Sequence, residues 1–545
     1  MTALRPTSPV PADRAAWYRA EGWWDTCGLA DGIEAAAATR PDAVALIDNE
    51  RAFSRADVAA AVAAGVALLG QHGLRAGASV VLVAGNTVHG VVAYHAALRA
   101  GATTAALDRR CGTADLRAAL DILDAPVTVI VPTAERDRLI EGRVDVAVIA
   151  LEAFADQPAR AALPSGKLAS RAAADRWIEP DRDAPAVVLF TSGTTGRPKG
   201  VVHSLNTLTA GAANMASITG ADERTVAFLV SPLTSITGVM QMHLTADSHA
   251  TLVLEDCFEP EHSLERIDRH GATLIGGAPV IAERLLRAAD ARGVRRLALR
   301  TLALGGAMLP MPLLEMATDR FGIEVARVYG SSEAPNSTGS LPGEPRAQRL
   351  ADDGALMPGT EVRIGSAEHP HEGLIRGPAV FLGYADAEHN VEAFEDDWFR
   401  TGDAVEVHAH RLTVVGRIKD VVNRNGLKIS PSEIDAALAL LPGVVEYASF
   451  GVPDSETGER LAVAVRPDGQ TVMTLDRVCA HLRAEGTATR KLPEQLVVWD
   501  EPLPRTVSGK VVRSRLLMES PAKHNEYAAR LRTEDPGAND DHHTR

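Results

Sequence analysis

Short apolar runs alternate with alanine-rich, helix-compatible stretches along most of this chain. One example is Val80-Val81-Leu82-Val83, which precedes a Gly-Asn turn and then a helical segment from Val88 to Arg99. Buried strands separated by helices predict parallel βαβ units, and therefore layered α/β sheets. The same pattern predicts further strands at residues 127–131, 146–151, 184–190, 250–254 and 302–304.

The chain is too long for a single core. It has 545 residues, whereas single hydrophobic cores stop growing at about 250–300 residues, so at least two domains are expected. Beyond Gly416 lies a smaller α+β unit of its own, with strands expected at residues 444–451, 461–465 and 495–498. We therefore expect an N-terminal domain over residues 1–416 and a C-terminal domain over residues 417–520.

The two ends of the chain differ in composition. Residues 1–30 contain Trp17, Tyr18, Trp23 and Trp24, which predict a leader that packs onto the first domain. Residues 521–545 are polar and charged, and are expected to form a disordered tail.

Composition excludes several classes of protein. The formal net charge of −15 argues against a general affinity for nucleic acid or anionic membranes, so anionic substrates must be held by local basic groups. The four cysteines are far apart and form no CxxC pair, which disfavours a zinc site or a disulfide framework. No run reaches the ~18 apolar residues of a membrane span, and no apolar signal core is visible. We expect a cytoplasmic protein.

The loop from Thr191 to Gly200, TSGTTGRPKG, has the composition of a polyphosphate-binding loop. Its glycines permit close backbone approach, its hydroxyls stand beside exposed amides, and Lys199 adds a fixed positive charge. A hydrophilic surface turn is the alternative interpretation. The loop is not a Walker A loop, because Lys199 is followed by Gly200 where Ser or Thr would hold magnesium.

Five motifs in a fixed order carry a resemblance to a known family. After the loop come YGSSE at 329–333, TGD at 401–403, GRIKD at 416–420 and PRTVSGK at 504–510. In their residues and in their order, these motifs resemble those of the AMP-forming acyl/aryl-CoA synthetases, a superfamily that includes carrier-loading adenylation domains and luciferases. The likeness covers about residues 25 to 520. It implies a large N-terminal domain of layered α/β sheets, a smaller mobile α+β C-terminal domain, and ATP, Mg²⁺ and CoA as cofactors.

The resemblance assigns roles to residues around the nucleotide. Lys510 would bridge the substrate carboxylate and the α-phosphate, with Thr195 and Glu333 completing the catalytic set. Glu333 would bind Mg²⁺, although a helix-capping carboxylate is its alternative role. Tyr329 would stack on adenine, and Asp403 would accept hydrogen bonds from the ribose. The implied ATP-binding residues are Thr191, Ser192, Gly193, Thr194, Thr195, Lys199, Gly305, Gly306, Ala307, Tyr329, Gly330, Ser331, Ser332, Asp403 and Arg417.

Thioester formation is expected to use a second arrangement of the C-terminal domain. By resemblance, Lys419 is the hinge about which that domain turns. The face that meets CoA would include Gly426, Leu427 and Lys428. Rotation is needed because Lys510 must leave before a thiol can approach the carbonyl of the adenylate, and such motions commonly gate turnover.

The segment that lines the acid pocket departs from the family pattern. Thr234 and Ser235 stand where members commonly have an aromatic–histidine pair, which is thought to gate the acid tunnel. No carboxylate is present here to pair with an α-amine, so an amino acid substrate is disfavoured. An apolar acid (cyclic, aromatic or medium-chain) is predicted instead. The expected pocket walls are Ser235, Thr237, Gln241, Gly305 and Gly330, together with Met242, Gly306 and Ala307.

The sequence therefore predicts an ATP-dependent carboxylic acid:CoA ligase, and it leaves alternatives open. A stand-alone adenylating enzyme would load its acyl or aryl group onto a carrier protein acting in trans. A regulatory ATP-binding pseudoenzyme is disfavoured because Lys199, Glu333, Asp403 and Lys510 are all present. A luciferase-like oxygenase would begin with the same adenylation. The expected partners are a small carboxylic acid and CoA, without nucleic acid or a membrane span, in a monomer or homodimer.

Overall fold

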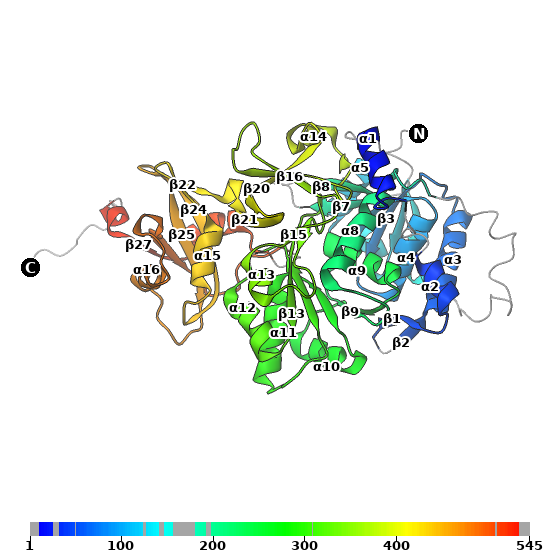
Figure 1. Cartoon of the computed structure of the whole chain (residues 1–545), viewed down its shortest axis with the longest axis horizontal. Helices are drawn as coiled ribbons and strands as arrows, with labels where there is room; N and C mark the ends of the chain where they lie inside the picture. The colour runs from blue at the N-terminus through cyan, green and yellow to red at the C-terminus, as the bar shows by residue number, and fades with distance from the viewer. Residues whose placement is uncertain are drawn as a thin grey trace, which may run out of the picture. The chain divides into compact units, whose positions relative to one another are not determined.

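The computed structural model describes residues 10–25, 32–49, 51–123, 127–140, 146–155, 180–191, 198–307, 309–506 and 510–533. Its contacts divide the chain into two compact units. The first contains Met1–Gly306, Met316–Thr401 and Val407–Thr413, and the second contains Ala307–Glu315, Gly402–Glu406 and Val414–Arg545. Figure 1 shows the elements of each unit, coloured along the chain.

One sheet of the first unit has a parallel centre. Strands β7, β4, β3, β5 and β6 run parallel, and β8 and β18 extend the β7 edge in antiparallel pairs. The order is β18 (Gly383–Tyr384), β8 (Lys199–Ser204), β7 (Pro185–Thr191), β4 (Thr103–Asp108), β3 (Ser79–Ala84), β5 (Val127–Val131) and β6 (Ala147–Ala150).

The other sheet of this unit is parallel from β13 to β1. Strands β20 and β21 contain residues of both units. The order is β16 (Glu361–Ile364), β17 (Glu372–Arg376), β20 (Trp398–His408), β21 (Arg411–Arg417), β15 (Ala355–Leu356), β14 (Thr338–Gly339), β13 (Glu324–Tyr329), β12 (Thr301–Gly305), β11 (Leu274–Gly277), β9 (Val226–Leu229), β10 (Thr251–Leu254), β1 (Val44–Asp48) and β2 (Arg51–Ser54), with β19 (Phe394–Glu395) paired to β20.

Helices connect these strands. They are α1 (Ala12–Ala20), α2 (Gly32–Thr39), α3 (Arg55–Gln71), α4 (Val88–Arg99), α5 (Thr113–Leu123), α6 (Thr133–Ile140), α8 (Leu205–Thr219), α9 (Ile236–Asp247), α10 (Pro260–His270), α11 (Pro279–Ala291), α13 (Arg346–Ala351) and α14 (Ala387–Ala393). The layered α/β architecture is therefore confirmed, as are the strands expected at 80–83, 127–131, 146–151, 184–190, 250–254 and 302–304, to within two residues at each end.

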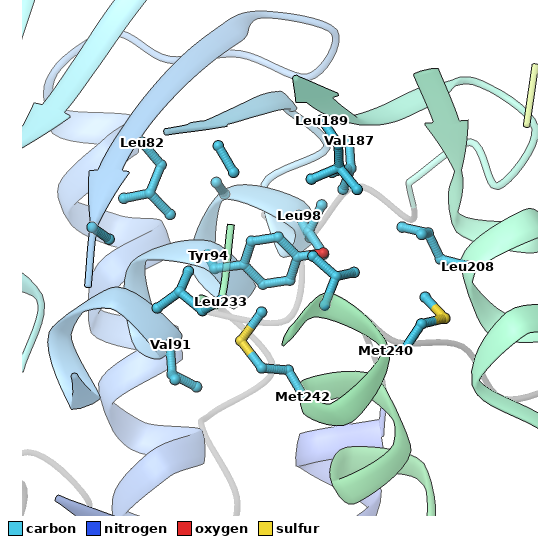
Figure 2. Packing of buried hydrophobic residues seen from close by; sticks show 14 of the residues in the cluster. Leu82, Val91, Tyr94, Leu98, Val187, Leu189, Leu208, Leu233, Met240 and Met242 are labelled. Carbon is cyan, nitrogen blue, oxygen red and sulfur yellow. The ribbon is translucent and has the colours of Figure 1, made fainter. Parts of the chain in front are cut away.

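A large apolar core packs among sheets and helices of the first unit, and a second cluster covers the opposite face of β3. Figure 2 shows Tyr94 of α4 at the centre of the large core, surrounded by aliphatic and methionine side chains from β3, β7, α8 and α9. Every residue of β3 is buried. A strand that is apolar on both faces must be covered on both faces, which explains the continuous Val-Val-Leu-Val run. The labelled members of the core are Leu82, Val91, Tyr94, Leu98, Val187, Leu189, Leu208, Leu233, Met240 and Met242.

The aromatic leader packs as predicted where the structure describes it. Tyr18 and Trp24 are buried, and the indole Nε1 of Trp24 donates to the carbonyl of Pro378 at 2.9 Å. Trp17 contacts both Tyr18 and Trp23 but stays partly exposed. These contacts attach α1 to the segment that precedes β18.

The second unit is built on a separate sheet. Its order is β23 (Leu427–Ile429), β22 (Val422–Arg424), β25 (Gly458–Pro467), β26 (Gln495–Val498) and β27 (His524–Tyr527), with β24 (Val444–Asp454) also paired to β25. Its helices are α12 (Met311–Glu315), α15 (Pro431–Leu438), α16 (Leu475–Ala484) and α17 (Arg513–Glu519). The three strands predicted for this part of the chain are confirmed. The domain limits expected at residues 416 and 520 stay a prediction.

The expectation of a disordered tail from residue 521 is wrong for residues 521–533. Strand β27 pairs antiparallel with β26, and the carboxylate of Glu526 accepts the backbone N–H of Leu475 at the start of α16. Arg530 binds Asp454 and Glu494 at 3.0 and 3.1 Å. Burial would raise the pKa of Asp454, but hydrogen bonds from Arg530 and Thr457 hold that pKa well below its usual range. Polar composition was misleading because these polar groups find partners in the folded unit.

No helix in the described part of the chain is long and apolar enough to cross a membrane.

Candidate active site

The glycine-rich loop connects two antiparallel strands. Thr191 ends β7 and Lys199 begins β8, and the two residues face each other in the ladder. Ser192, Gly193, Thr194 and Thr195 lie outside the described residues. A hairpin of this kind differs from the strand–loop–helix of a Walker A site, in agreement with the sequence.

The segment with Glu333 follows the carboxyl end of β13. Tyr329 closes that strand, and the hydroxyl of Ser331 accepts the backbone N–H groups of Glu333 and Ala334, both at 3.2 Å. The backbone carbonyl of Glu333 accepts the N–H of Phe381 at 2.8 Å. Residues 330–337 form turns and no helix, so the alternative role of Glu333 as a helix cap is wrong.

Tyr384 links the lysine of the loop to Glu333. Its hydroxyl donates to Glu333 Oε1 at 2.8 Å, and Lys199 Nζ lies 4.9 Å from the centre of its ring. The backbone of Tyr384 is held by β18 against β8 and by two hydrogen bonds to the side chain of Asn390. A cation thus lies over the ring of Tyr384, and a carboxylate accepts a hydrogen bond from the hydroxyl of the same residue, which suits a site for a polyphosphate and its metal ion.

His203 holds the segment that contains Glu333 through a hydrogen bond to the backbone of Ser332. It lies on β8, fully buried, and its Nε2 donates to the carbonyl of Ser332 at 2.7 Å. Burial lowers the pKa of His203 to about 4, and only the backbone of Ser332 and the charge of Glu333 oppose this effect. The ring is therefore neutral at pH 7. Because a carbonyl can only accept, the proton lies on Nε2 and His203 acts as a positioning residue.

Two residues predicted to line the acid pocket lie at the carboxyl ends of parallel strands. Gly305 ends β12, and a Cβ added there would stand 2.3 Å from the carbonyl oxygen of Val328 on β13, so only glycine fits. Gly330 follows β13 directly. In open α/β sheets, ligands bind outside the carboxyl ends of the strands. Gly306, also in the predicted pocket, has a positive φ of 78°.

Helix α9 brings the remaining wall residues of the acid pocket. Ser235 is its N-cap: the hydroxyl accepts the N–H of Gly238 and donates to the carbonyl of Pro232 at 2.7 Å. Thr237 is half-buried. Gln241 is fully buried, with its Nε2 donating to the carbonyl of Gly276 at 3.0 Å, whereas its Oε1 has no partner in the described chain. Met242 points into the core shown in Figure 2.

The second unit contains the other predicted nucleotide residues. Asp403 is buried, and Arg417 Nε lies 2.7 Å from its Oδ1. Ala307 belongs to this unit as well. Lys419 lies in a short 3₁₀ turn, Ile418–Asp420, between β21 and β22. Lys419 is six residues beyond Thr413, the last residue of the first unit.

The proposed CoA face contains a tight hairpin turn. Asn425 and Gly426 connect β22 to β23, with φ of 52° and 84°, and Arg424 pairs with Leu427 across the ladder. Two central residues with positive φ are typical of a type I′ turn, for which Asn-Gly is the preferred sequence. Gly426 thus has a local structural role, and Lys428 follows it on β23.

Lys510 follows residues 507–509, which lie outside the described part of the chain. The backbone N–H of Thr506 donates to the carbonyl of Lys510 at 2.8 Å, and Arg505 binds Glu446 at 2.9 Å. Burial would raise the pKa of Glu446, but hydrogen bonds from Arg505 and Arg466 keep it below its usual range. The carboxylate is therefore charged at neutral pH, and Lys510 itself is exposed.

The structure thus brings Lys199 and Glu333 together in the first unit, and Asp403 and Arg417 together in the second. Sequence reasoning missed His203 and Tyr384. The available signals were a histidine within an apolar strand and a Gly-Tyr pair with no assigned role. In the parts of the chain that are described, no group of three or more His, Cys, Asp or Glu side chains could hold a metal ion unaided. A carboxylate such as Glu333 nevertheless suits Mg²⁺, which usually takes one or two carboxylates and completes its shell with phosphates and water.

Comparison with known proteins gives consistent matches. A family model described as AMP-binding enzyme matches residues 33–385, and one described as AMP-binding enzyme C-terminal domain matches residues 433–510. A Streptomyces protein named salicylyl-CoA synthase / salicylate adenylyltransferase is 30% identical, over 93% of this chain and 96% of the relative. The medium-chain fatty-acid–CoA ligase of Escherichia coli is 29% identical, over 93% of each chain.

A solved structure shows the same fold. The o-succinylbenzoate CoA synthetase of Bacillus subtilis, in complex with ATP and a magnesium ion, superposes with a TM-score of 0.75. It is 24% identical and covers 89% of this chain and 99% of its own.

Proposed function

This chain belongs to the AMP-binding enzyme family as an AMP-forming acid–CoA ligase type of enzyme, and from that premise we propose that it activates an apolar carboxylic acid and transfers the acyl group to CoA. The observation that carries the proposal is the arrangement of Lys199, Tyr384 and Glu333 beside the glycine-rich loop. It supplies a cation for phosphate and a carboxylate for Mg²⁺ within one small site.

In the proposed first half reaction, a carboxylate oxygen of the acid attacks the α-phosphorus of ATP. A new O–P bond forms, the bond to the bridging oxygen breaks, and pyrophosphate leaves. Lys199 would neutralise charge on the polyphosphate, and Lys510 would stabilise charge near the α-phosphate. Mg²⁺ held by Glu333 would supply further neutralisation of the phosphates. Asp403 and Arg417 would hold the ribose.

In the proposed second half reaction, the thiolate of CoA attacks the carbonyl carbon of the acyl-adenylate. A C–S bond forms and AMP leaves with the former carboxylate oxygen. The thiol proton is released to solvent. Lys510 must be withdrawn for the thiol to approach, and Lys419 is the proposed hinge for that movement. Gly426, Leu427 and Lys428 are proposed to meet CoA.

The nature of the acid is inferred from the pocket walls and from the relatives. Of the predicted wall residues, Thr237 and Gln241 carry no charge. The two named relatives act on salicylate and on medium-chain fatty acids. We therefore propose an aromatic, cyclic or medium-chain monocarboxylate, and not an amino acid.

Acid-dependent exchange of pyrophosphate into ATP tests the proposal. The panel should contain benzoate, salicylate, cyclohexanecarboxylate, octanoate and phenylalanine. We expect exchange with at least one of the first four acids and none with phenylalanine. Exchange with no acid would contradict the activity, and preference for phenylalanine would contradict the substrate class.

The thiol acceptor is tested separately. A carrier protein acting in trans, the alternative that the sequence leaves open, is the second candidate acceptor. Product formation with CoA should exceed that with a phosphopantetheinylated carrier protein. The reverse preference would replace the CoA ligase with a carrier-loading enzyme while leaving the adenylation step intact.

Replacing Tyr384 with phenylalanine tests the link between Lys199 and Glu333. The substitution keeps the ring under Lys199 but removes the hydrogen bond to Glu333. A hydrogen bond to a charged group contributes about 1.5 kcal/mol, so we expect the Mg²⁺ concentration for half-maximal exchange to rise roughly tenfold. The KM for the acid should not change. Tyr384→Leu, which also removes the ring, should additionally raise the KM for ATP. An unchanged Mg²⁺ requirement in both variants would show that Tyr384 has only a packing role.

Replacing Lys419 with proline tests the hinge. Proline fixes φ near about −65° and removes an N–H, so it restricts the rotation that the second half reaction needs. We expect acyl-CoA formation to fall by more than about tenfold, because the second step needs rotation of the C-terminal domain. Pyrophosphate exchange should stay within about threefold of the wild-type rate, because the first step does not need that rotation. Lys419→Ala is the matched control, because it removes the charge and keeps the backbone free. Equal loss in both steps would contradict the hinge assignment.

A further inference from the structure

The Gly-Asn turn that follows β3 has no role in the reaction as proposed, although its asparagine is almost completely buried. Asn86 is 4% exposed, and it directly precedes Thr87, the N-cap of α4. Burying an amide side chain costs free energy unless its polar groups are hydrogen-bonded. The partners of Asn86 therefore indicate what the residue does.

Both polar groups of the Asn86 side chain have backbone partners. Oδ1 accepts the N–H of Leu233 at 2.8 Å. Nδ2 donates to three carbonyls, those of Leu229, Ser231 and Glu255, at 3.3, 3.0 and 2.9 Å. Because a carbonyl can only accept and a backbone N–H can only donate, these partners determine which side of the amide is the nitrogen.

The partners of Asn86 lie where strands of both sheets of the first unit end. Asn86 comes two residues after β3, whereas Leu229 is the last residue of β9 and Glu255 directly follows β10. Strand β3 belongs to one sheet, and β9 and β10 belong to the other. Asn86 thus connects the two sheets at the carboxyl ends of parallel strands, which is where α/β proteins bind their ligands.

The backbone of the turn is held at the end of β10 as well. The N–H of Asn86 donates to Asp256 Oδ1 at 2.9 Å, and Asp256 Oδ2 lies 2.9 Å from Nη2 of Arg109. A Cβ added to Gly85 would stand 2.3 Å from the same Asp256 Oδ1, so glycine permits this close approach. Contacts with Asp256 therefore explain both residues of the Gly-Asn turn.

The segment that Asn86 binds leads directly into the proposed acid pocket. Ser231 and Leu233, whose backbones it contacts, are followed by Ser235, the N-cap of α9. Thr237 lies in the first turn of that helix. The position of these two pocket residues therefore depends on the backbone that Asn86 holds.

Two further contacts bind the same segment to its surroundings. Ser231 Oγ and Gln241 Nε2 both donate to the carbonyl of Gly276 on β11, at 3.4 and 3.0 Å. Leu233 is fully buried in the large core shown in Figure 2. The bonds from Asn86 act on the backbone of the segment, whereas these contacts act through its side chains.

We propose that Asn86 is a positioning residue for the acid substrate: it fixes the backbone at Ser231 and Leu233 and thereby sets where α9 places the wall of the acid pocket. The inference rests on the proposed function, because it assigns Asn86 to the acid site of that reaction. Small displacements of a supporting segment can cost a reaction about 100-fold in rate. Lys199 and Glu333 are in contact with Tyr384 instead, so a change at Asn86 should affect the acid and not ATP.

Replacing Asn86 with alanine tests the inference in the pyrophosphate exchange assay. We expect the KM for the preferred acid to rise at least about tenfold, because several hydrogen bonds are lost together. The KM for ATP should stay within about twofold, since the nucleotide residues are held by other contacts. The ratio of kcat/KM between the preferred acid and the next best should also fall, because a less fixed wall discriminates less.

Thr103→Val is the matched control for this substitution. Thr103 is buried at the amino end of β4, and its hydroxyl donates to the carbonyl of Pro185 at 2.8 Å. The variant loses a hydrogen bond to the backbone far along the strand from the carboxyl ends, and it should keep the wild-type KM for acid and ATP. Proportional changes in both KM values of Asn86→Ala, or an unchanged KM for the acid, would overturn the inference.

A milder pair of variants serves if Asn86→Ala does not fold. Asp256→Ala removes the acceptor of the Asn86 N–H, and we expect the KM for the acid to rise about threefold, the size of one hydrogen bond. Arg109→Gln loses the same ion pair but leaves Asp256 in place to accept that N–H, and it should behave as wild type. Equal effects of the two variants on the KM for the acid would contradict a role that acts through Asn86.

Hydrogen exchange gives a measurement that does not require an active acid. In Asn86→Ala or Asp256→Ala, protection of the backbone amides should fall in residues 231–238 and stay unchanged in the rest of the first unit, because the contact opens locally. Unchanged protection of 231–238, or equal loss over the whole unit, would overturn the inference. An unchanged KM for the acid in an active enzyme contradicts this inference alone, whereas a wild type without acid-dependent exchange contradicts the proposed function and this inference with it.

Discussion

Replacing Lys510 with alanine is expected to lower the rate of adenylate formation by about 100- to 1000-fold, the usual loss for one preorganised charge contact at a transition state. The described backbone on either side of residues 507–509 supports this prediction. A backbone bridge joins Arg505 and Val511, and an ion pair with Glu446 holds Arg505. Lys510 therefore lies beside held backbone, and it carries its charge on a long and flexible side chain.

The two half reactions should respond differently to this substitution. Acyl-CoA formation from chemically prepared acyl-adenylate should fall far less than pyrophosphate exchange, because Lys510 is withdrawn for the second step. Lys491→Ala is the matched control: it lies in the same unit and loses only an exposed ion pair with Glu433. Equal losses in the two half reactions would be incompatible with the role proposed for Lys510.

Replacing Glu333 with glutamine is expected to reduce exchange activity by about 100-fold at low Mg²⁺, with partial recovery as the Mg²⁺ concentration rises. Loss of an outer-shell partner typically weakens metal binding by roughly 10- to 100-fold, and loss of a charged ligand should cost at least as much. The substitution preserves the shape of the side chain and its ability to accept the hydrogen bond from Tyr384. The change therefore isolates the charge.

Titration of exchange activity with Mg²⁺ measures this effect. Glu392→Gln, an exposed change on α14, is the matched control and should behave as wild type. A normal Mg²⁺ dependence in Glu333→Gln would show that the carboxylate only accepts the Tyr384 hydroxyl. We expect the Mg²⁺ concentration for half-maximal exchange to rise more in Glu333→Gln than in Tyr384→Phe.

Much of the fold could be predicted from local sequence patterns. The run Val80–Val83 and the strand from Val127 to Val131 are apolar on both faces, which is typical of central parallel strands. Composition predicts these strands well because it shows how apolar a segment is. It predicts the tail wrongly because it does not show that Glu526 and Arg530 bind partners far away in the chain.

The candidate site was predictable only where its residues lie within motifs. Glu333, Asp403 and Lys510 stand in short ordered motifs, and their proposed roles rest on that resemblance. Tyr384 has no such context, although it lies between Lys199 and Glu333. Gly426 lies in a segment to which the resemblance assigns CoA binding, but its identity is explained locally by an Asn-Gly turn with two positive φ angles.

The sequence by itself determined the alternation of strands and helices and the order of the motifs, because both depend on residues close together in the chain. Only the tertiary structure decided which side chains meet. Tyr384 and Glu333 are 51 residues apart, and His203 and Ser332 are 129 apart. Arg55 carries a charge, yet it is buried at the start of α3. Burial and long-range pairing depend on how the elements pack, and packing is a property of the whole folded unit.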